Sequence, residues 1–233
     1  MSDMGQHRLP GNPPVEISLR RSARARRMTL RVSSLDGRVT LTVPRHVSDR
    51  EALAFAETRA EWVRGHVERA PGETVVAEEA ELPIDGTPHV VRRGDVAAAT
   101  ARDGVLYVPR RSRAVPRAVQ AYLKATARDA LSEACDRFAA KLGRPYAALS
   151  LRDTRSRWGS CTAEGRIMLS WRLIMAPRDV RDYVAAHEVA HLAEMNHSPA
   201  FWARVAEIYG PHDRQRAWLR HHGPALHRVR FDL

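Results

Sequence analysis

Three histidines and one glutamate near the C-terminal end of the chain have the types and spacing of a metal site. The motif H-E-x-x-H runs from His187 to His191, and His197 follows six residues later. On a helix, His187 and His191 lie one turn apart on the same face, so both imidazoles can reach one metal ion. Glu188 stands beside the first histidine, where its carboxylate can reach a water on that metal. Two imidazole ligands and a carboxylate base are the arrangement of zinc peptidases.

These four residues predict one Zn²⁺ ion bound by His187, His191 and His197, with Glu188 as the general base. Glu188 is expected to accept a proton from the zinc-bound water as it attacks a carbonyl carbon, and then to deliver that proton to the leaving amine. Glu194 competes with His197 for the third position, because it lies three residues after His191 on the same helical face. Its carboxylate could bind the metal directly or orient a ligand histidine.

Hydrolysis at such a site also needs a donor for the oxyanion of the tetrahedral intermediate. Arg157, Tyr209 and His212 are the candidates, since each side chain can donate a hydrogen bond. Tyr209 and His212 stand at a loop between the helices that follow the motif, where either could overhang the site. Tyr183 also carries a donor, but its position one turn before His187 favours packing against the core.

The composition is that of a globular protein, with 44% hydrophobic and 28% charged residues among 233. The chain has no run of about 18 apolar residues, which a membrane helix would need, and its first residues lack the apolar core of a signal peptide. The two cysteines, Cys135 and Cys161, do not form a disulfide framework. We therefore expect a cytoplasmic protein with no membrane partner.

The formal net charge is +11, with 38 basic residues against 27 acidic ones. Such a charge permits nucleic acid as a partner, although a composition biased towards arginine explains it equally well. The arginine-rich stretch from Arg20 to Arg31 has the same two interpretations. It is either a solvated strand face or a patch that tracks phosphates, and salt-dependent binding to DNA would distinguish them.

The N-terminal half is predicted to be a β-rich module over residues 15–110, after a disordered lead-in over residues 1–14 that prolines interrupt. Ser48 and Glu51 have the spacing of a capping box, which predicts a helix over residues 49–69. Strands are expected over residues 15–19, 28–32, 38–43, 81–84, 88–93 and 104–108.

Residues 111–233 are predicted to form the domain that carries the histidine motif. A long helix begins at Pro116 and ends at about residue 142, and three short strands follow it. The motif helix is expected over residues 178–195. Pro199 and Pro211 each begin a further helix. The fold class is α+β, with the long helix behind the sheet and the motif helix presenting its histidines beneath the edge strand of that sheet.

The ends of the motif helix and of the chain carry two further expectations. The chain must turn at Met195-Asn196, since asparagine tolerates the left-handed backbone conformation. The tail histidines His221, His222 and His227 are expected to be solvated.

Several segments around the motif share their residues with a known family. They are Arg157-Trp158-Gly159-Ser160-Cys161, Ile167–Leu173, Ala176-Pro177, Asp182–Leu192 and Asn196–Trp202. Together they closely resemble the YgjP-like metallopeptidases, a bacterial group related to the SprT-type zinc peptidases. The first half resembles that family too, in residues 21–32, Pro44 and Trp62-Val63. The resemblance implies a zincin-like catalytic domain and zinc-dependent hydrolysis of peptides.

The chain departs from another group with the same histidine spacing, the metzincins. Glu194 stands where their bending glycine would be. No methionine turn follows, because Met195 is the only methionine after the motif helix begins. This departure questions the geometry of His197 rather than the presence of a site.

We therefore expect a zinc metallopeptidase that hydrolyses protein or peptide substrates bound extended along the edge strand. The alternative is a nucleic-acid-associated protein or binding module with a structural or vestigial zinc site. An open fourth coordination position that Glu188 faces would favour the enzyme, because four protein ligands close a structural zinc site. The motif also allows hydrolysis of a non-peptide amide.

Overall fold

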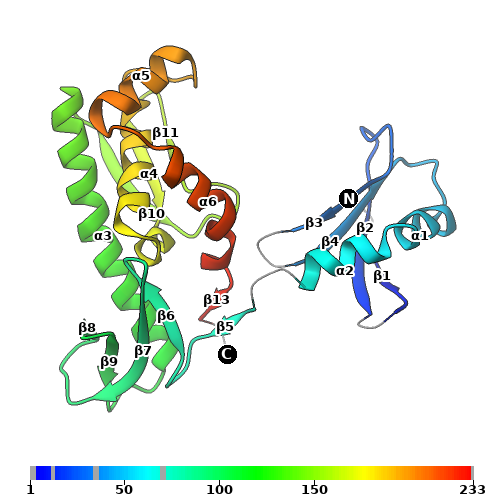
Figure 1. Ribbon diagram of the computed structural model, residues 1–233, viewed down its shortest axis with the longest axis horizontal. Coiled ribbons are helices and arrows are strands. Elements are labelled where there is room, and N and C mark those ends of the chain that lie inside the picture. The colour runs from blue at the N-terminus through cyan, green and yellow to red at the C-terminus, as the bar shows by residue number, and fades with distance from the viewer. Residues whose placement is uncertain (1–3, 12–13, 34–36, 69–71, 232–233) are drawn as a thin grey trace. The chain divides into compact units, whose positions relative to one another are not determined.

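The computed structural model describes residues 4–11, 14–33, 37–68 and 72–231, and it divides the chain into two compact units, Met1–Gly72 and Glu73–Leu233 (Figure 1). The first unit contains a four-stranded sheet with the strand order β1-β2-β4-β3. Its strands are β1 (Met4–Leu9), β2 (Val15–Arg21), β3 (Thr29–Val32) and β4 (Val39–Val43). β1 and β3 are antiparallel to their neighbours, whereas β2 and β4 run parallel. β3 therefore lies at one edge of this sheet.

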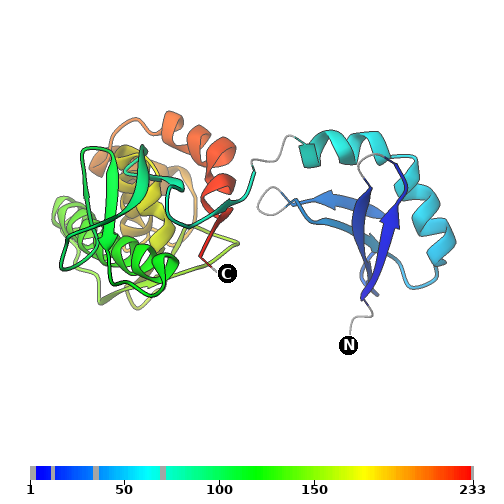
Figure 2. The ribbon, with the colours of Figure 1, turned by 90° about the horizontal axis from the view of Figure 1, so that it is seen from below.

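Two helices, α1 (Asp49–Glu57) and α2 (Ala60–Glu68), cover one face of this sheet (Figure 2). The strands alternate buried and exposed residues, as a sheet with one covered face requires. Their buried side chains, such as Ile17 and Leu41, pack with Ala52, Ala56 and Val63 of the helices. These contacts give the first unit a hydrophobic core of its own.

The structure corrects two expectations about this unit. Residues 4–9 are not a disordered lead-in, because they pair with β2 along their whole length and bury Leu9. The predicted helix over 49–69 is two helices, which separate at Thr58, where the side-chain hydroxyl donates to the carbonyl of Phe55 at 2.7 Å. The capping box is confirmed, since the Ser48 amide donates to Glu51 Oε2 at 2.9 Å and the Glu51 amide to Ser48 Oγ at 3.3 Å.

The second unit begins with strands that lie within residues 15–110, the range predicted to be the N-terminal module. These are β5 (Thr74–Val75), β6 (Glu81–Ile84), β7 (Thr87–Gly94), β8 (Thr100–Arg102) and β9 (Val105–Pro109), and two of them, β5 and β8, were not predicted. The last four form a sheet of order β6-β7-β9-β8. Its buried side chains, including Val91 and Leu106, belong to the same core as those of the long helix α3 (Val115–Leu142). The structure thus divides after Gly72 rather than near residue 110, because a shared core joins this sheet to the histidine motif.

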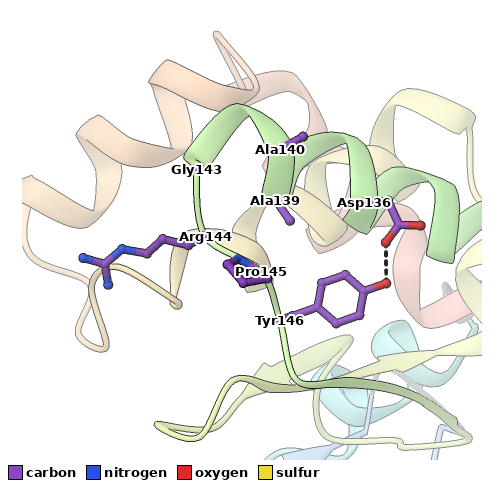
Figure 3. Close-up of a pocket in the computed structure, with 7 residues that line it drawn as sticks. All are labelled: Asp136, Ala139, Ala140, Gly143, Arg144, Pro145 and Tyr146. Atoms are coloured by element: carbon purple, nitrogen blue, oxygen red, sulfur yellow. Dashed lines mark hydrogen bonds between the residues drawn. The ribbon is translucent and has the colours of Figure 1, made fainter.

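α3 is the backing helix that the sequence predicts, with Pro116 in its first turn and Gly143 at φ 71° after its last residue. A cavity of about 570 Å³ lies beside its C-terminal end (Figure 3). There the Tyr146 hydroxyl donates to Asp136 Oδ1 at 2.5 Å, and burial raises the pKa of Tyr146 to about 12. None of the described residues lining this cavity is a predicted site residue.

A three-stranded sheet of order β10-β12-β11 follows α3. Its strands are β10 (Ala148–Arg152), β11 (Gly159–Cys161) and β12 (Arg166–Ser170). β10 is parallel to β12 and β11 is antiparallel to it, so β11 is an edge strand. The short helix η1 (Trp171–Met175) then leads to the motif helix α4 (Arg178–Ala190). This arrangement of helices and strands is the α+β class that the sequence predicts.

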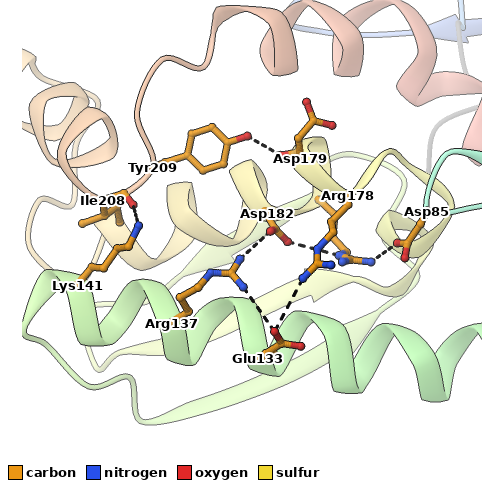
Figure 4. Close-up of polar contacts among 10 residues, drawn as sticks. Asp85, Glu133, Arg137, Lys141, Arg178, Asp179, Asp182, Ile208 and Tyr209 are labelled. Atoms are coloured by element: carbon orange, nitrogen blue, oxygen red, sulfur yellow. Dashed lines mark hydrogen bonds and ion pairs between the residues drawn. The ribbon is translucent and has the colours of Figure 1, made fainter.

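The turn between β6 and β7 holds the N-terminal end of α4 (Figure 4). The Asp85 amide donates to the carbonyl of Ile174 at 2.8 Å, and the Asp85 carboxylate accepts from Arg181 of α4. Gly86 has φ +76°, and a Cβ there would lie 2.9 Å from the Pro177 Cα. Arg181 is only 4% exposed, so the turn supplies a counter-charge to a buried cation of the motif helix.

The same cation is part of a network that reaches α3. Arg181 Nε lies 3.6 Å from Asp182 Oδ1, and Arg137 of α3 donates to Asp182 Oδ2 at 2.6 Å. Arg137 also lies 3.6 Å from Glu133, one turn earlier on the same helix. These ion pairs connect α3 and α4 at the end of α4 opposite the histidines.

The C-terminal helices complete the unit. They are α5 (Pro199–Ile208) and α6 (Asp213–Leu226), and the final strand β13 (Val229–Arg230) runs parallel to β5. His227 is not solvated as expected: it is 7% exposed, and its ring stacks on Trp158 with centroids 4.7 Å apart. The Arg172 guanidinium donates to the carbonyls of Leu226 and Val229 nearby. No helix among the described residues is long and apolar enough to cross a membrane.

Candidate metal centre

The three predicted ligand histidines come together at the C-terminal end of α4. His187 lies in the last turn of the helix, His191 is its C-cap, and His197 belongs to the segment before α5. One ring nitrogen from each lies within 4.8 Å of the others. The Nε2 atoms of His187 and His197 are 3.1 Å apart. The tertiary structure therefore joins a residue outside the helix to the pair that helical spacing places together.

The turn after α4 brings His197 back and differs from the expected one. α4 ends at Ala190, five residues earlier than predicted. The Leu192 and Ala193 amides donate to the carbonyls three residues before them, those of Val189 and Ala190, instead of continuing the four-residue spacing of an α-helix. Neither Met195 nor Asn196 is among the described residues with positive φ. Asn196 instead accepts the Ser198 amide on its side-chain oxygen at 3.0 Å. The prediction of a left-handed asparagine was therefore wrong. The chain turns instead through a hydrogen bond from the Ser198 amide to the Asn196 side chain.

Glu194 contributes its backbone rather than its carboxylate. Its carbonyl lies 2.9 Å from His191 Nδ1, which assigns the proton to that nitrogen and leaves His191 Nε2 with a free lone pair. The carboxylate is outside the cluster of candidate ligand atoms. Because α4 ends before residue 194, the helical spacing that made Glu194 a competitor of His197 does not apply.

The donor set fits a divalent metal. Zinc–nitrogen bonds of about 2.0–2.1 Å in a tetrahedron place ligand nitrogens about 3.3 Å apart, close to the 3.1 Å between His187 and His197. Burial, together with the other two histidines, lowers the pKa of His187 to about 3, and burial also lowers the pKa of His191. Both imidazoles are therefore neutral near pH 7, which is the form that binds a metal.

Phe201 forms the floor of the cluster. Its ring is fully buried, and its centroid lies 4.8, 4.4 and 4.8 Å from the rings of His187, His191 and His197. The helix α5 that carries Phe201 begins at Pro199, and the side-chain oxygen of its N-cap residue, Ser198, accepts the Phe201 amide. An apolar ring in this position excludes water from one side of the cluster and limits the rotation of all three imidazoles.

Glu188 lies beside the cluster in a position that constrains its carboxylate. It is 6% exposed, and burial raises its pKa to about 8, against an opposing effect of Arg157. Gly159 of the edge strand β11 faces it so closely that a Cβ there would lie 2.5 Å from Glu188 Oε1. A metal cation on the three histidines would lower this pKa again, since an opposite charge favours the carboxylate.

A stack of rings forms another wall of the site. His212 lies between Tyr183 and Trp202, nearly parallel to both, with centroids 5.4 and 5.5 Å away. Trp202 approaches the His197 ring to 5.8 Å, and the Arg216 guanidinium lies 4.5 Å above the Trp202 ring. The stack places an exposed cation, Arg216, near a histidine cluster in which His191 is buried and His197 is exposed.

The predicted oxyanion donors are distributed unevenly around the site. Arg157 is exposed and close enough to Glu188 to affect its pKa. The His212 ring is held in the stack, and its Nδ1 lies 3.0 Å from the Gly210 carbonyl. Tyr209 is directed elsewhere, because its hydroxyl donates to the Asp179 carbonyl in the first turn of α4 at 2.7 Å.

Four residues near the cluster had no predicted role in the site: Gly159, Phe201, Trp202 and Arg216. Gly159 and the two aromatic residues were within the segments that resemble the family, which was the available signal for them. Arg216 had no signal, since its position near the cluster depends on how α6 packs against α4. The chain has 36 arginines, and no motif or spacing in the sequence distinguishes Arg216 from the others as a site residue.

The family model described as YgjP-like, metallopeptidase domain, matches residues 26–222, which is most of the chain. A search of curated proteins finds no match. Among solved structures, the crystal structure of the metallopeptidase zymogen of Pyrococcus abyssi abylysin is 19% identical, covering 39% of this chain and 90% of that one, with a TM-score of 0.35. On the strength of the family model, this chain belongs to the YgjP-like metallopeptidase family.

Proposed function

We propose that the protein is a zinc-dependent peptidase in which Glu188 is the general base. The observation that carries this proposal is that Glu188, the residue next to His187 of the three-histidine cluster, has its carboxylate buried against Gly159 of the edge strand β11. The cluster offers three protein ligands among the described residues. Structural zinc sites use four protein ligands, and catalytic ones use three and leave a position open. The donor set thus supports a catalytic rather than a structural site.

Zinc is the metal that these residues suit best. Three imidazole ligands favour zinc and other late first-row metals over magnesium or calcium, which prefer oxygen ligands. When bound, the ion would supply Lewis acidity that polarises a carbonyl and lowers the pKa of a water molecule. His187, His191 and His197 would hold it, and the Glu194 carbonyl would fix the orientation of His191.

Glu188 is suited to move a proton between water and the leaving amine. Burial raises the pKa of its carboxyl to about 8, and a cation on the three histidines would lower that pKa towards the charged form that accepts a proton. The nearby Arg157 favours the charged, proton-accepting form before the reaction. We assign to Arg157 the further task of donating to the developing oxyanion, because it is exposed at the rim beside Glu188.

A polypeptide substrate is supported by the edge of β11 that has no strand partner. Among the described residues β11 pairs with β12 alone, so its other side can receive an extended chain. Such a chain would pass Glu188, because Gly159 is part of β11 and touches the carboxylate. Backbone pairing of this kind accepts many side chains, which suits a peptidase of broad sequence preference.

The test is a comparison of the wild-type protein with Glu188→Gln. The variant should bind as much zinc as the wild type, measured by elemental analysis, and should lose about 10²–10⁴-fold in the rate of cleaving a labelled unfolded protein. Glu164→Gln is a matched control, because Glu164 is exposed in the turn between β11 and β12. Wild-type rates from Glu188→Gln would refute the assigned base.

A further inference from the structure

A groove of about 360 Å³ lies on the first unit, between the edge strand β3 and the helices α1 and α2. Residues 28–30 form one side of it, and the rings of Phe55 and Trp62 form the other. Arg27 and Arg59 also line it. Trp62 is 46% exposed, which is unusual for a large aromatic residue beside an apolar groove.

β3 has an exposed backbone edge beside this groove. It is the last strand in the order β1-β2-β4-β3, and within the described parts of the chain it pairs with β4 alone. The amide and carbonyl groups on its outer side are therefore available to another extended chain. A strand added there would lie along the groove, because Thr29 and Leu30 belong to both.

The charged side chains that line the groove are all positive. Residues 1–72 contain 13 arginines against 8 acidic residues. Arg27, Arg31 and Arg59 are all exposed, and the described residues that line the groove include no acid. Arg21 differs from them, because it donates to the Val47 carbonyl at 2.6 Å and pairs with Asp49. The arginine-rich stretch thus contains a structural residue, Arg21, and exposed cations, of which Arg27 lines the groove.

We propose that β3 and this groove bind an acidic, extended polypeptide segment of another protein. The segment would add to the sheet as a strand next to β3. One of its apolar side chains would occupy the space between Leu30, Phe55 and Trp62, and its carboxylates would pair with Arg27 and Arg59. This proposal does not depend on the metal centre, which belongs to the other unit.

Two features favour a polypeptide over a single-stranded nucleic acid. An open strand edge presents backbone donors and acceptors at the spacing of another strand. A nucleic acid backbone does not have donors and acceptors at that spacing. The Trp62 ring is also partly covered, since the His66 ring lies 4.3 Å away at 37°. A nucleic acid needs a free aromatic face for stacking, whereas an apolar side chain can pack against a ring edge.

The first experiment measures fluorescence anisotropy of a short labelled peptide that alternates glutamate with valine around a central phenylalanine. The full chain carries Glu188→Gln so that the peptide is not cleaved. The double variant Arg27→Glu, Arg59→Glu should weaken binding at least about tenfold. Arg45→Glu, Arg50→Glu is the matched control, because it changes the net charge equally and neither residue lines the groove. Equal weakening by both pairs would show only a long-range charge effect and would overturn the proposal.

The second experiment tests strand addition directly. Two versions of the peptide carry N-methyl groups on alternate residues, so that each blocks the amides of one edge only. A peptide that binds as an added strand should lose binding in one version and retain it in the other, because only one of its edges faces β3. Equal binding by both versions, or tighter binding of an oligothymidylate than of the acidic peptide, would refute the assignment.

Discussion

The Cα of Gly159 packs directly against the carboxylate of Glu188, so that a Cβ at residue 159 would lie 2.5 Å from Oε1 and 2.6 Å from Cγ. This contact joins the edge strand β11 to the motif helix α4 at the point where the reaction is proposed to occur. Only glycine allows the strand to approach so closely. The position of the proposed base therefore depends on a residue that has no side chain.

Gly159→Ala should displace the Glu188 carboxylate and reduce the peptidase rate by about a hundredfold. The atoms nearest to the added methyl group all belong to the Glu188 side chain, from Cγ to Oε1, so we expect Glu188 to move while the fold and the zinc content remain. Rates on an unfolded protein substrate and elemental analysis of the same samples measure both effects. Gly72→Ala is the matched control, because a Cβ there has nothing within 4 Å. Wild-type turnover in Gly159→Ala would show that this contact does not position the base.

His197→Ala should weaken zinc binding by at least about a hundredfold, because it removes one of three donors. His197 lies outside the motif helix, yet its Nε2 is 3.1 Å from that of His187. Competition with a coloured zinc chelator measures the affinity. His222→Ala serves as the control, since His222 is exposed on α6. Unchanged zinc affinity and activity in His197→Ala would remove this residue from the site.

Asp85→Ala should destabilise the second unit by about 1–2 kcal/mol. It removes a counter-charge from the buried Arg181, which keeps Asp182 as a partner at 3.6 Å. The half-exposed position of Asp85 keeps the loss below that of a fully buried pair. Urea unfolding measures the change. Glu207→Ala, which breaks the exposed Arg204–Glu207 pair, should lower the free energy of unfolding by less than about 0.5 kcal/mol. An equal decrease in both variants would show that Asp85 does not stabilise the unit by pairing with a buried cation.

Protonation of His227 should lower the free energy of unfolding of the second unit in mild acid. Burial, with the positive charge of Arg172, lowers its pKa from 6.5 to about 4. The folded state keeps the ring neutral while the unfolded state binds a proton, so stability is full above about pH 6.5 and falls as the pH drops towards 4. Between about pH 7 and pH 5 the loss is about 2 kcal/mol.

The comparison is between wild type and His227→Gln, by urea unfolding at the two pH values. Other histidines, His187 among them, contribute in the same direction, so the difference between the two proteins isolates residue 227. The variant should be less stable at neutral pH, because it loses the stack on Trp158, but its stability should change less with pH. An identical pH dependence in both proteins would contradict the assigned pKa.

Local patterns predicted many of the helices and strands of the two units. The capping box at Ser48, Pro116 in the first turn of α3 and Gly143 after its last turn were each recognisable, because caps and breakers act within a few residues. The division of the chain was not, since the strands of residues 81–109 have the same alternation whichever core they join. Only the packing of Val91 and Leu106 with α3 assigned them to the second unit.

The sequence by itself determined the chemistry of the candidate centre. The helical repeat places His187 and His191 one turn apart, and Glu188 follows the first of them. This combination of residue types at this spacing is typical of zinc peptidases. The tertiary structure decided how that chemistry is organised. It brought His197 back through an asparagine turn, ended α4 before Glu194 and set Gly159 against Glu188. Each of these depends on contacts between segments distant along the chain, whose energies no local periodicity records.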